Sequence, residues 1–310
     1  MKYAFFQGCN IPVRIEQYAD STRAVLDKFG VELVELREFN CCGYPVRNVD
    51  EKSYILPSVR NLAIAEKENL DIAVICNCCF ASLMKAKNVL ENDQELLRDI
   101  NSVLAKEDLH YSGKAAIKHY LDILYSDIGT EKIAAKLVYK VRDLNIAVIQ
   151  GCHLLRPREI TGFDNSFVPK ITDALVNCTG AENLEWQGKL ECCGAALAGI
   201  NDNLCHTLLL EKTEGAKKAG AQYITPICSY CHLQFDTNQP NIVQEEKDIL
   251  PVLLYPQILG LCLGLSAEEL GIGLNRTISA DDIEKVKSTL GSPVDDKKNK
   301  KKKGKVKQAA

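Results

Sequence analysis

The feature that most constrains this chain is a set of five cysteines that occurs twice. Cys-Cys-Gly stands at residues 41–43 and again at 192–194. A lone cysteine precedes each pair and a Cys-x-x-Cys motif follows it, so the two sets correspond at separations of 143 to 152 residues. The first set is Cys9, Cys41, Cys42, Cys76 and Cys79, and the second is Cys152, Cys192, Cys193, Cys228 and Cys231. This internal repeat predicts two similar halves.

Short apolar segments precede the lone cysteines and the Cys-x-x-Cys motifs. Together with two similar segments they predict buried strands at 3–6, 31–36, 72–75, 145–149, 183–186 and 222–227. Helical patterns lie between them, such as 202–220, which closes on Gly220 in the manner of a helix C-cap. The alternation predicts an α/β fold: two pseudo-symmetric Rossmann-like domains with small, mostly parallel sheets, joined by a helical connector. In such sheets sites form beyond the carboxyl ends of strands, where these cysteines fall.

The repeat also suggests domain boundaries. We expect an N-terminal cysteine-rich domain at 1–90, a helical connector at 91–144, a C-terminal cysteine-rich domain at 145–290 and a disordered basic tail at 291–310. The net charge is −3, and because eight lysines lie between Lys297 and Lys307, the remaining residues carry −11. An acidic body is a poor nucleic-acid binder, so we expect no nucleic-acid partner. The tail is interpreted as a solvated end, or as a segment that docks on an acidic partner.

Two observations bear on the compartment. The N-terminus has only a short apolar stretch and no cleavage pattern, so we expect no signal peptide. The apolar run Val252–Leu265 contains Pro256 and is shorter than the roughly 20 residues of a membrane span, so we expect a buried core helix. These features predict a cytoplasmic protein, in which fourteen cysteines stay thiols unless they bind metal.

The cysteine spacing favours iron-sulfur chemistry over zinc. Adjacent cysteines rarely form a disulfide with each other. Structural zinc takes four ligands in a tetrahedron, which five cysteines with an adjacent pair fit poorly. A cluster with several irons accepts neighbouring thiolates. A lone Cys-x-x-Cys is also compatible with a thioredoxin-like redox pair, but such a pair would not call for the other three cysteines.

The pattern resembles the family of cysteine-rich CCG-domain proteins over Met1 to about Thr277. Within that family the context looks most like the B subunit of heterodisulfide reductase, in "GCHLLRP" (151–157), "PICSYCH" (226–232) and "LLYPQILGLCLGLSAEELGIGLNR" (253–276). The resemblance implies two non-cubane 4Fe-4S clusters, with the five cysteines of each set as ligands. It also implies reduction of the mixed disulfide of coenzyme M and coenzyme B to the two thiols, in methanogenesis. The partners it implies are the ferredoxin-like iron-sulfur C subunit and the flavin-containing A subunit of the same complex, and a hydrogenase or formate dehydrogenase.

Some positions depart from the pattern or from the repeat. Cys78 adds a third thiol to the first Cys-x-x-Cys, opposite Tyr230, and we expect Cys76 and Cys79 rather than Cys78 to be ligands. His153 stands where the first half has Asn10, and we predict that it donates a proton to a thiolate leaving the split disulfide, or only hydrogen-bonds near the cluster. Cysteines without a repeat partner are interpreted as buried structural residues: Cys178, Cys205 and Cys262. Arg156 and Arg158 are candidates for binding an anionic substrate, or for solvated surface charges.

Three functions remain open from the sequence. The first is the catalytic subunit of a disulfide reductase, in which two flanking clusters supply the two electrons that a disulfide needs. The second is an electron-transfer subunit of the CCG type, acting on another disulfide or a quinone. The third is a structural zinc or scaffold protein. The absence of ferredoxin motifs in this sequence favours the first over the second, and the ten repeated cysteines argue against the third.

Overall fold

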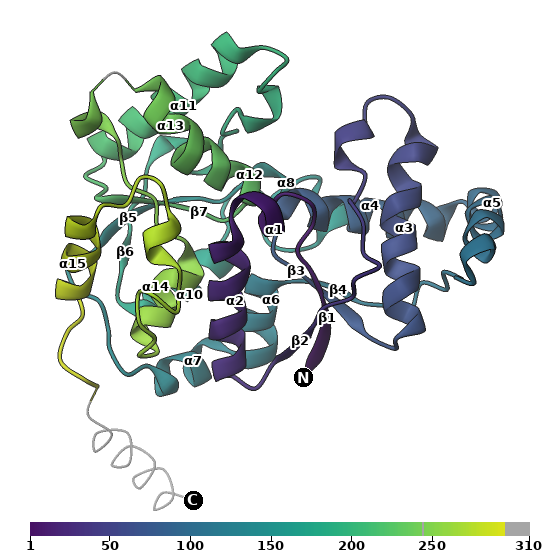
Figure 1. Cartoon of the computed structure of the whole chain (residues 1–310), viewed down its shortest axis with the longest axis horizontal. Helices are drawn as coiled ribbons and strands as arrows, with labels where there is room; N and C mark the ends of the chain where they lie inside the picture. The colour runs from purple at the N-terminus through teal and green to yellow at the C-terminus, as the bar shows by residue number, and fades with distance from the viewer. Residues whose placement is uncertain (244, 295–310) are drawn as a thin grey trace, which may run out of the picture.

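The computed structural model describes residues 1–243 and 245–294, which form two small sheets packed with helices (Figure 1). The first sheet has the order β2-β1-β3-β4 and consists of β1 (Lys2–Phe6), β2 (Glu32–Val34), β3 (Asp71–Val74) and β4 (Ile117–His119). The second has the order β6-β5-β7 and consists of β5 (Asn145–Ile149), β6 (Glu182–Asn183) and β7 (Tyr223–Pro226). All of these strands pair in parallel, which confirms the predicted α/β fold with two small parallel sheets.

The two sheets share one topology, as the sequence repeat predicts. In each, the first strand of the half lies in the centre, because it pairs with the next strand on one side and the third on the other. A fourth strand position, beside the third strand, is also occupied in both sheets. In the first it is β4, and in the second Val252 forms a parallel bridge with Ile224 of β7. The second sheet is the smaller because β6 has only two residues, although the sequence suggested a strand at 183–186.

The segment 91–144 is less purely helical than the sequence suggests. It contains α5 (Gln94–Leu104), α6 (Tyr120–Asp122), a π-helical turn (Ile123–Ile128) and α7 (Thr130–Lys136), but also β4. Residues of β4 pair with β3, with His119 opposite Val74. A strand of three residues is too short to show a period of two, so only its place beside β3 reveals it. The connector therefore completes the first sheet.

Helices surround both sheets and account for most of the remaining described chain. Long helices follow the second strand of each half, and their N-terminal caps correspond: Asp50 accepts a hydrogen bond from the backbone N–H of Ser53, and Asn201 from that of Leu204. These two helices are α3 (Glu51–Lys67) and α11 (Asp202–Lys218). The other α-helices outside the connector are α1 (Ile11–Arg14), α2 (Glu16–Lys28), α4 (Asn77–Asn92), α8 (Cys152–Leu155), α9 (Arg158–Thr161), α10 (Ile171–Thr179), α12 (Ser229–His232), α13 (Gln239–Ile242), α14 (Tyr255–Cys262) and α15 (Ala280–Ser288).

The halves are packed against each other around a common apolar core. Helix α2 of the first half lies against α14 of the second, and α4 lies against α8 and α9 (Figure 1). The hydroxyl of Tyr18 in α2 donates a hydrogen bond of 2.7 Å to the carbonyl of Ile227, just after β7. All of α14 is buried, as expected for the apolar run that contains it. No helix among residues 1–243 and 245–294 is long and apolar enough to cross a membrane.

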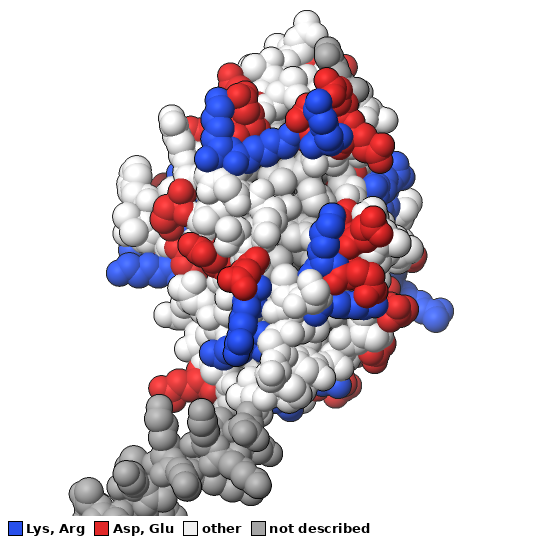
Figure 2. All heavy atoms as spheres, turned by 90° about the vertical axis from the view of Figure 1, so that its left-hand side faces the viewer, with Lys and Arg blue, Asp and Glu red and all other residues white. Residues whose placement is uncertain are grey.

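The surface carries interspersed charges. On the face shown in Figure 2, basic side chains stand beside acidic ones over much of the area. Ion pairs in α15 illustrate this, with Lys285 3.1 Å from Asp282 and Lys287 3.0 Å from Glu284. Most of the predicted basic tail, 295–310, lies outside the described residues.

Candidate metal centre

The cysteines gather at the carboxyl ends of the central strands, as the chain order of strands and cysteines predicts. Cys9 follows β1 and Cys152 follows β5. Cys76 and Cys228 follow β3 and β7, and each is the residue just before a helix, α4 or α12. Because β1 and β3 are neighbours in one sheet, and β5 and β7 in the other, each lone cysteine is brought close to its own Cys-x-x-Cys motif.

A tight turn presents each adjacent pair. Gly43 has φ +85° and Gly194 has φ +79°, a left-handed conformation that favours glycine. A Cβ at Gly43 would also lie 2.4 Å from the carbonyl oxygen of Tyr54, so this position has no room for a side chain. The turn aims backbone N–H groups at sulfur, and that of Gly194 lies 3.4 Å from Cys192 Sγ.

The five thiols of the first set form one connected group. Cys41 Sγ lies 3.9 Å from Cys9 Sγ, and hydrogen bonds with Cys42 and Cys9 lower the pKa of Cys41. Hydrogen bonds with Cys42 and with Cys76 raise the pKa of the buried Cys79. A hydrogen bond with Cys41 is also the largest cause of the raised pKa of Cys9. Crowded sulfurs cannot all ionise without a cation to neutralise them.

The second set is arranged in the same way. Cys231 Sγ lies 3.2 Å from Cys193 Sγ, and Cys231 is also hydrogen-bonded to Cys228. Hydrogen bonds with Cys152 and Cys193 lower the pKa of Cys192, whereas the bond with Cys192 is the largest cause of the raised pKa of Cys152. The structure thus brings together each set that the sequence identifies.

Each set lines a small cavity. The cavity of the first set has a volume of about 10 Å³ and that of the second about 30 Å³. Ten sulfur donors, five at each place and none of them in a disulfide, suit polynuclear iron-sulfur clusters, each of which needs several thiolates at one place. The residues present therefore fit the group that the sequence suggests.

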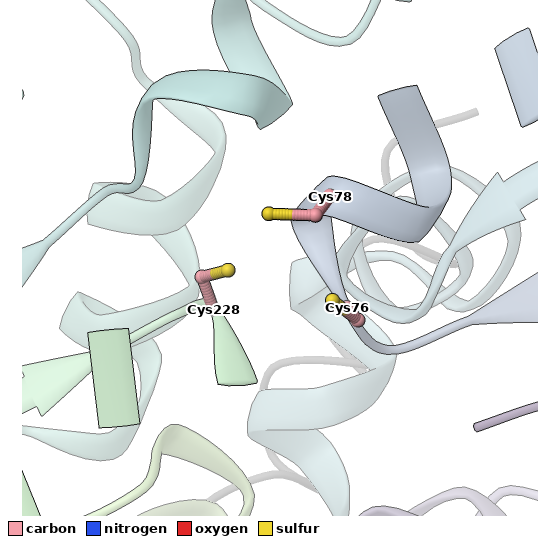
Figure 3. A group of neighbouring side chains, drawn as sticks. All are labelled: Cys76, Cys78 and Cys228. Atoms are coloured by element: carbon pink, nitrogen blue, oxygen red, sulfur yellow. The ribbon is translucent and has the colours of Figure 1, made fainter. Parts of the chain in front are cut away.

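Cys78 lies between the two sets. It comes from the first turn of α4 beside Cys76, and its sulfur points toward Cys228 at the end of β7 (Figure 3). The sulfurs of these three residues all lie within 4.8 Å of one another. Hydrogen bonds with Cys228 and Cys76 raise the pKa of Cys78. The repeat alignment places Cys78 opposite Tyr230 but could not show that it reaches the other half.

The two cavities share a wall. Three side chains line both of them: Tyr44, Cys78 and Tyr230. The rings of Tyr44 and Tyr230 have centroids 5.8 Å apart. Sequence reasoning missed Tyr44, although the repeat held a signal, because its counterpart in the second half is Ala195.

His153 lies beside this wall. Its Nδ1 is 3.4 Å from Cys152 Sγ and 3.7 Å from Cys78 Sγ, and its Nε2 is 3.3 Å from the hydroxyl of Tyr44. Burial lowers the pKa of His153. Its counterpart Asn10 hydrogen-bonds Tyr230 in the opposite half. Both residues that follow the lone cysteines therefore reach across the boundary between the halves.

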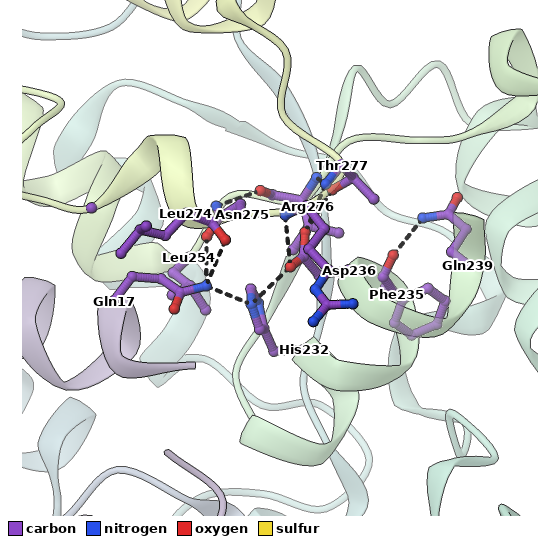
Figure 4. Close-up of polar contacts among 12 residues, drawn as sticks. Gln17, His232, Phe235, Asp236, Gln239, Leu254, Leu274, Asn275, Arg276 and Thr277 are labelled. Carbon is purple, nitrogen blue, oxygen red and sulfur yellow. Dashed lines mark hydrogen bonds and ion pairs between the residues drawn. The ribbon is translucent and has the colours of Figure 1, made fainter. Parts of the chain in front are cut away.

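A second polar group, which the sequence did not indicate, lies behind the second set. His232 follows Cys231 in the sequence, and its ring is fully buried. Its Nε2 is 3.4 Å from both the amide nitrogen of Gln17 and a carboxylate oxygen of Asp236 (Figure 4). Burial raises the pKa of Asp236, but its bonds with His232 and with the backbone N–H groups of Arg276 and Thr277 outweigh that effect, so the pKa is lowered. Gln17 comes from α2, so the group connects the two halves.

The remaining candidates from the sequence lie outside both cavities. Cys205 and Cys262 are buried, as expected, and Cys178 is half-buried. Arg156 donates hydrogen bonds of 3.2 Å to the carbonyls of Leu190 and Ser166, so its guanidinium is engaged by backbone. Arg158 is exposed.

Comparison with known proteins agrees with this geometry. Residues 3–84 and 146–236 match the family described as the CCG cysteine-rich domain. The chain is 32% identical over 291 residues to the B subunit of the ferredoxin/F(420)H(2)-dependent CoB-CoM heterodisulfide reductase of Methanosarcina acetivorans, covering 92% of this chain and 97% of that protein. It is 30% identical over 277 residues to the membrane anchor subunit of the 8-methylmenaquinol:fumarate reductase of Wolinella succinogenes, covering 88% and 96%.

A solved structure shares the fold. The crystal structure of a hypothetical protein from Helicobacter pylori matches with a TM-score of 0.75 at 17% identity, over 90% of this chain and 52% of that one. The two domain matches coincide with the two cysteine sets, and the relatives align over nearly the whole chain. The chain therefore belongs to the CCG cysteine-rich domain family, and within that family it resembles the B subunit of heterodisulfide reductase.

Proposed function

We propose that this chain is the catalytic subunit of a heterodisulfide reductase, which reduces the mixed disulfide of coenzyme M and coenzyme B to the two thiols. One observation carries the proposal: the two thiol sets meet, with Cys76 and Cys228 within 4.8 Å of each other and two cavities divided by one wall. A disulfide that enters at this wall has a redox group on each side. The similarity to B subunits of this enzyme supports the same substrate.

Each set of five cysteines is proposed to hold one non-cubane 4Fe-4S cluster. The ligands of the first are Cys9, Cys41, Cys42, Cys76 and Cys79, and those of the second are Cys152, Cys192, Cys193, Cys228 and Cys231. Two clusters supply the two electrons that cleavage of a disulfide requires, because a cluster ordinarily transfers one at a time. Turn glycines and the strand ends position the sulfurs before a cluster is bound.

The residues beside the wall are proposed to deliver one of the two protons that reduction of a disulfide to two thiols requires, and to position the substrate. His153 Nε2 is 3.3 Å from the hydroxyl of Tyr44, so the imidazole and the phenol can pass a proton along one hydrogen bond. The rings of Tyr44 and Tyr230 keep this space apolar, which limits access of water to the reacting sulfurs.

The setting proposed for this chain is a complex in the cytoplasm, in methanogenesis. Fourteen cysteines without a disulfide suit a reducing compartment. The partners proposed are the ferredoxin-like iron-sulfur C subunit and the flavin-containing A subunit, with a hydrogenase or formate dehydrogenase as electron source. The names of the relatives, which mark them as parts of larger enzymes, support an assembly of this kind.

A second candidate is electron transfer to a quinone. It is favoured by the similarity to a relative that is named as part of an 8-methylmenaquinol:fumarate reductase. In that function the clusters would relay electrons and no disulfide would be split at the wall.

One assay separates the candidates. The chain, purified without oxygen together with its partners, is expected to contain iron and acid-labile sulfide and to reduce the coenzyme M–coenzyme B disulfide with a reduced dye as donor. His153→Ala is expected to retain its iron and to reduce the disulfide more slowly. Quinone-dependent oxidation without disulfide reduction would favour the second candidate. Bound zinc without sulfide would contradict both.

A further inference from the structure

Lys212 in α11 is a buried cation beside the second set of cysteines. Its side chain is 3% exposed, and its ammonium donates hydrogen bonds to the backbone carbonyls of Gly188 and of Glu191, the latter at 2.9 Å. The ammonium also lies 5.3 Å from the ring centre of Trp186. Among residues 1–243 and 245–294, no carboxylate forms an ion pair with it.

A buried charge without an ion-pair partner is costly unless other charge neutralises it. Burial lowers the pKa of Lys212, and the negative charges of Cys231, Cys193, Glu191 and Cys192 offset this effect only in part. Three of these four groups are cysteines of the second set. The side chain of Glu191 is exposed, so solvent screens its charge. Cys192 is exposed as well, so the counter-charge within the protein interior comes from the buried sulfurs of Cys193 and Cys231, which are thiolates when they ligate a cluster.

Lys189, the other buried lysine of this region, shows the contrast. It is 6% exposed, and its ammonium lies 2.9 Å from carboxylate oxygens of both Asp173 and Glu185. These two carboxylates neutralise the charge of Lys189, so it does not require a further counter-charge from the cysteine set.

The repeat places a neutral residue where Lys212 stands. Asn61 in α3 precedes Lys212 by 151 residues, the separation that also relates the Cys-Cys-Gly turns. Its amide Nδ2 donates a 3.2 Å hydrogen bond to the carbonyl of Asn40, which is the counterpart of Glu191. Asn61 and Lys212 thus support the same turn in the same way, but only Lys212 brings a charge.

The other hydrogen bonds to the two cysteine sets are either the same in both halves or come from uncharged donors. Backbone N–H groups of Gly43 and Tyr44 bond the first pair, as those of Gly194 and Ala195 bond the second. Ser229 donates a neutral 3.0 Å hydrogen bond to Cys76.

Arg47, in the first half, has no charged counterpart, because Ala198 stands at that position of the repeat. Its guanidinium stacks 4.0 Å from the ring centre of Tyr44 and is partly exposed, so solvent screens its charge. The buried, unscreened cation is therefore specific to the second half.

We propose that Lys212 is the counter-charge of the second cluster and gives it a higher reduction potential than the first. The inference rests on the proposed function, because it requires a cluster in each set. A nearby cation favours the form with the more negative charge, which is the reduced form, and net charge is one of the properties that set cluster potentials. Electrons shared between the clusters reside mainly on the second, next to His153.

Three matched variants test the inference. Lys212→Asn copies the first half, Lys212→Arg keeps the charge, and Asn61→Lys transfers it to the first half. The potentials of both clusters are measured by redox titration with electron paramagnetic resonance on the anaerobically purified complex. Signals are assigned with Cys41→Ser and Cys192→Ser, each of which disturbs one set.

We expect Lys212→Asn to lower the potential of the second cluster toward that of the first, and Lys212→Arg to leave it near its original value. Asn61→Lys is expected to raise the potential of the first cluster only. Unchanged potentials in Lys212→Asn with full iron content would overturn the inference. If that variant loses its second cluster, Asn61→Lys decides: a raised first potential supports the inference and an unchanged one refutes it. A wild-type complex without iron and sulfide would contradict the proposed function itself.

Discussion

At the scale of single residues, the two halves differ at the positions that face each other. Cys78 and Tyr230 occupy equivalent positions after the fourth cysteine of each set, and both line the shared wall. Asn10 and His153 are likewise equivalent, and each contacts the other half. These differences lie beside the space between the cysteine sets, where a substrate would meet both. A functional difference between the two halves would therefore arise at these positions.

The roles of Cys78 and Cys79 can be separated by substitution. Cys79→Ser is expected to lose the first cluster, about half of the iron, because Cys79 is hydrogen-bonded to two other members of its set. Cys78→Ser is expected to keep the iron, because Cys78 is shared between the sets. Iron and sulfide analysis of the two purified variants gives the answer. Loss of iron only in Cys78→Ser would reverse the assignment.

His119, at the end of β4, predicts a pH dependence of stability. It is fully buried against the rings of Phe80, Tyr120 and Phe163, and burial lowers its pKa to about 3. The unfolded chain takes up this proton near pH 6.5, so protonation favours unfolding. The stability due to neutral His119 is complete above that pH and is lost as the pH falls toward 3. This amounts to about 2 kcal/mol between pH 6.5 and pH 4.5.

The measurement compares denaturant unfolding of His119→Asn and the unaltered chain across this range. Asn can accept the hydrogen bond from the backbone N–H of Leu121, now made to the imidazole, but does not titrate. We expect the free energy of unfolding of His119→Asn to fall less steeply toward low pH than that of the unaltered chain. Replacement of the exposed His110 by Asn serves as the control and should leave the slope unchanged. Equal slopes in all three proteins would refute the assignment to His119.

At the scale of elements, strand ends and glycine turns place the sulfurs. The central strands end where the lone cysteines begin, and the same topology in both sheets repeats this arrangement. The adjacent pairs need a turn as well, because two neighbouring side chains must both face one cavity. Gly43 and Gly194 provide it in the same left-handed conformation. The arrangement of the sulfurs is therefore a property of backbone elements and not only of the cysteines.

Gly43→Ala should disrupt this turn. The new methyl group would add positive-φ strain to a contact of 2.4 Å with the carbonyl of Tyr54, at a total cost of about 3 kcal/mol in unfolding free energy, with loss of iron from the first set. Gly30 is a matched control, because it also has a positive φ but would place no atom within 4 Å of the added Cβ. Gly30→Ala is expected to cost only about 1 kcal/mol and to retain full iron. Equal effects of the two substitutions on stability and iron would refute a role for the close contact.

At the scale of the whole molecule, burial between the halves sets the geometry of the site. The polar group around His232 and Asp236 joins α2 to the C-terminal segment directly behind the second cysteine set. Asp236 is 1% exposed and accepts hydrogen bonds from Arg276 and Thr277. A polar group of this kind is stabilising only while all of its members are present, so it ties the docking of the halves to the integrity of the site.

Asp236→Ala is expected to lower the free energy of unfolding by about 3 kcal/mol, because it leaves buried N–H groups and His232 without their acceptor. Chemical denaturation of the metal-free chain measures this without interference from clusters. Asp20→Ala, at an exposed position of α2, should change stability by less than about 0.5 kcal/mol. A similarly small effect at Asp236 would show that the buried group does not hold the halves together.

The sequence alone determined which cysteines lie together and where they lie in the fold. Chain order and local pattern suffice for this, because a short apolar strand followed by cysteine, present in both halves, places sulfur at the carboxyl edge of a parallel sheet. Only the tertiary structure decided that the two sets meet, that Cys78 lies between them, and that β4 completes the first sheet. Those features depend on packing between residues far apart in the chain, which leaves no local periodicity in the sequence. The inference about Lys212 needs both the sequence and the structure. The sequence repeat identifies its neutral counterpart, Asn61, and the structure shows that its charge is buried and so is not screened by solvent.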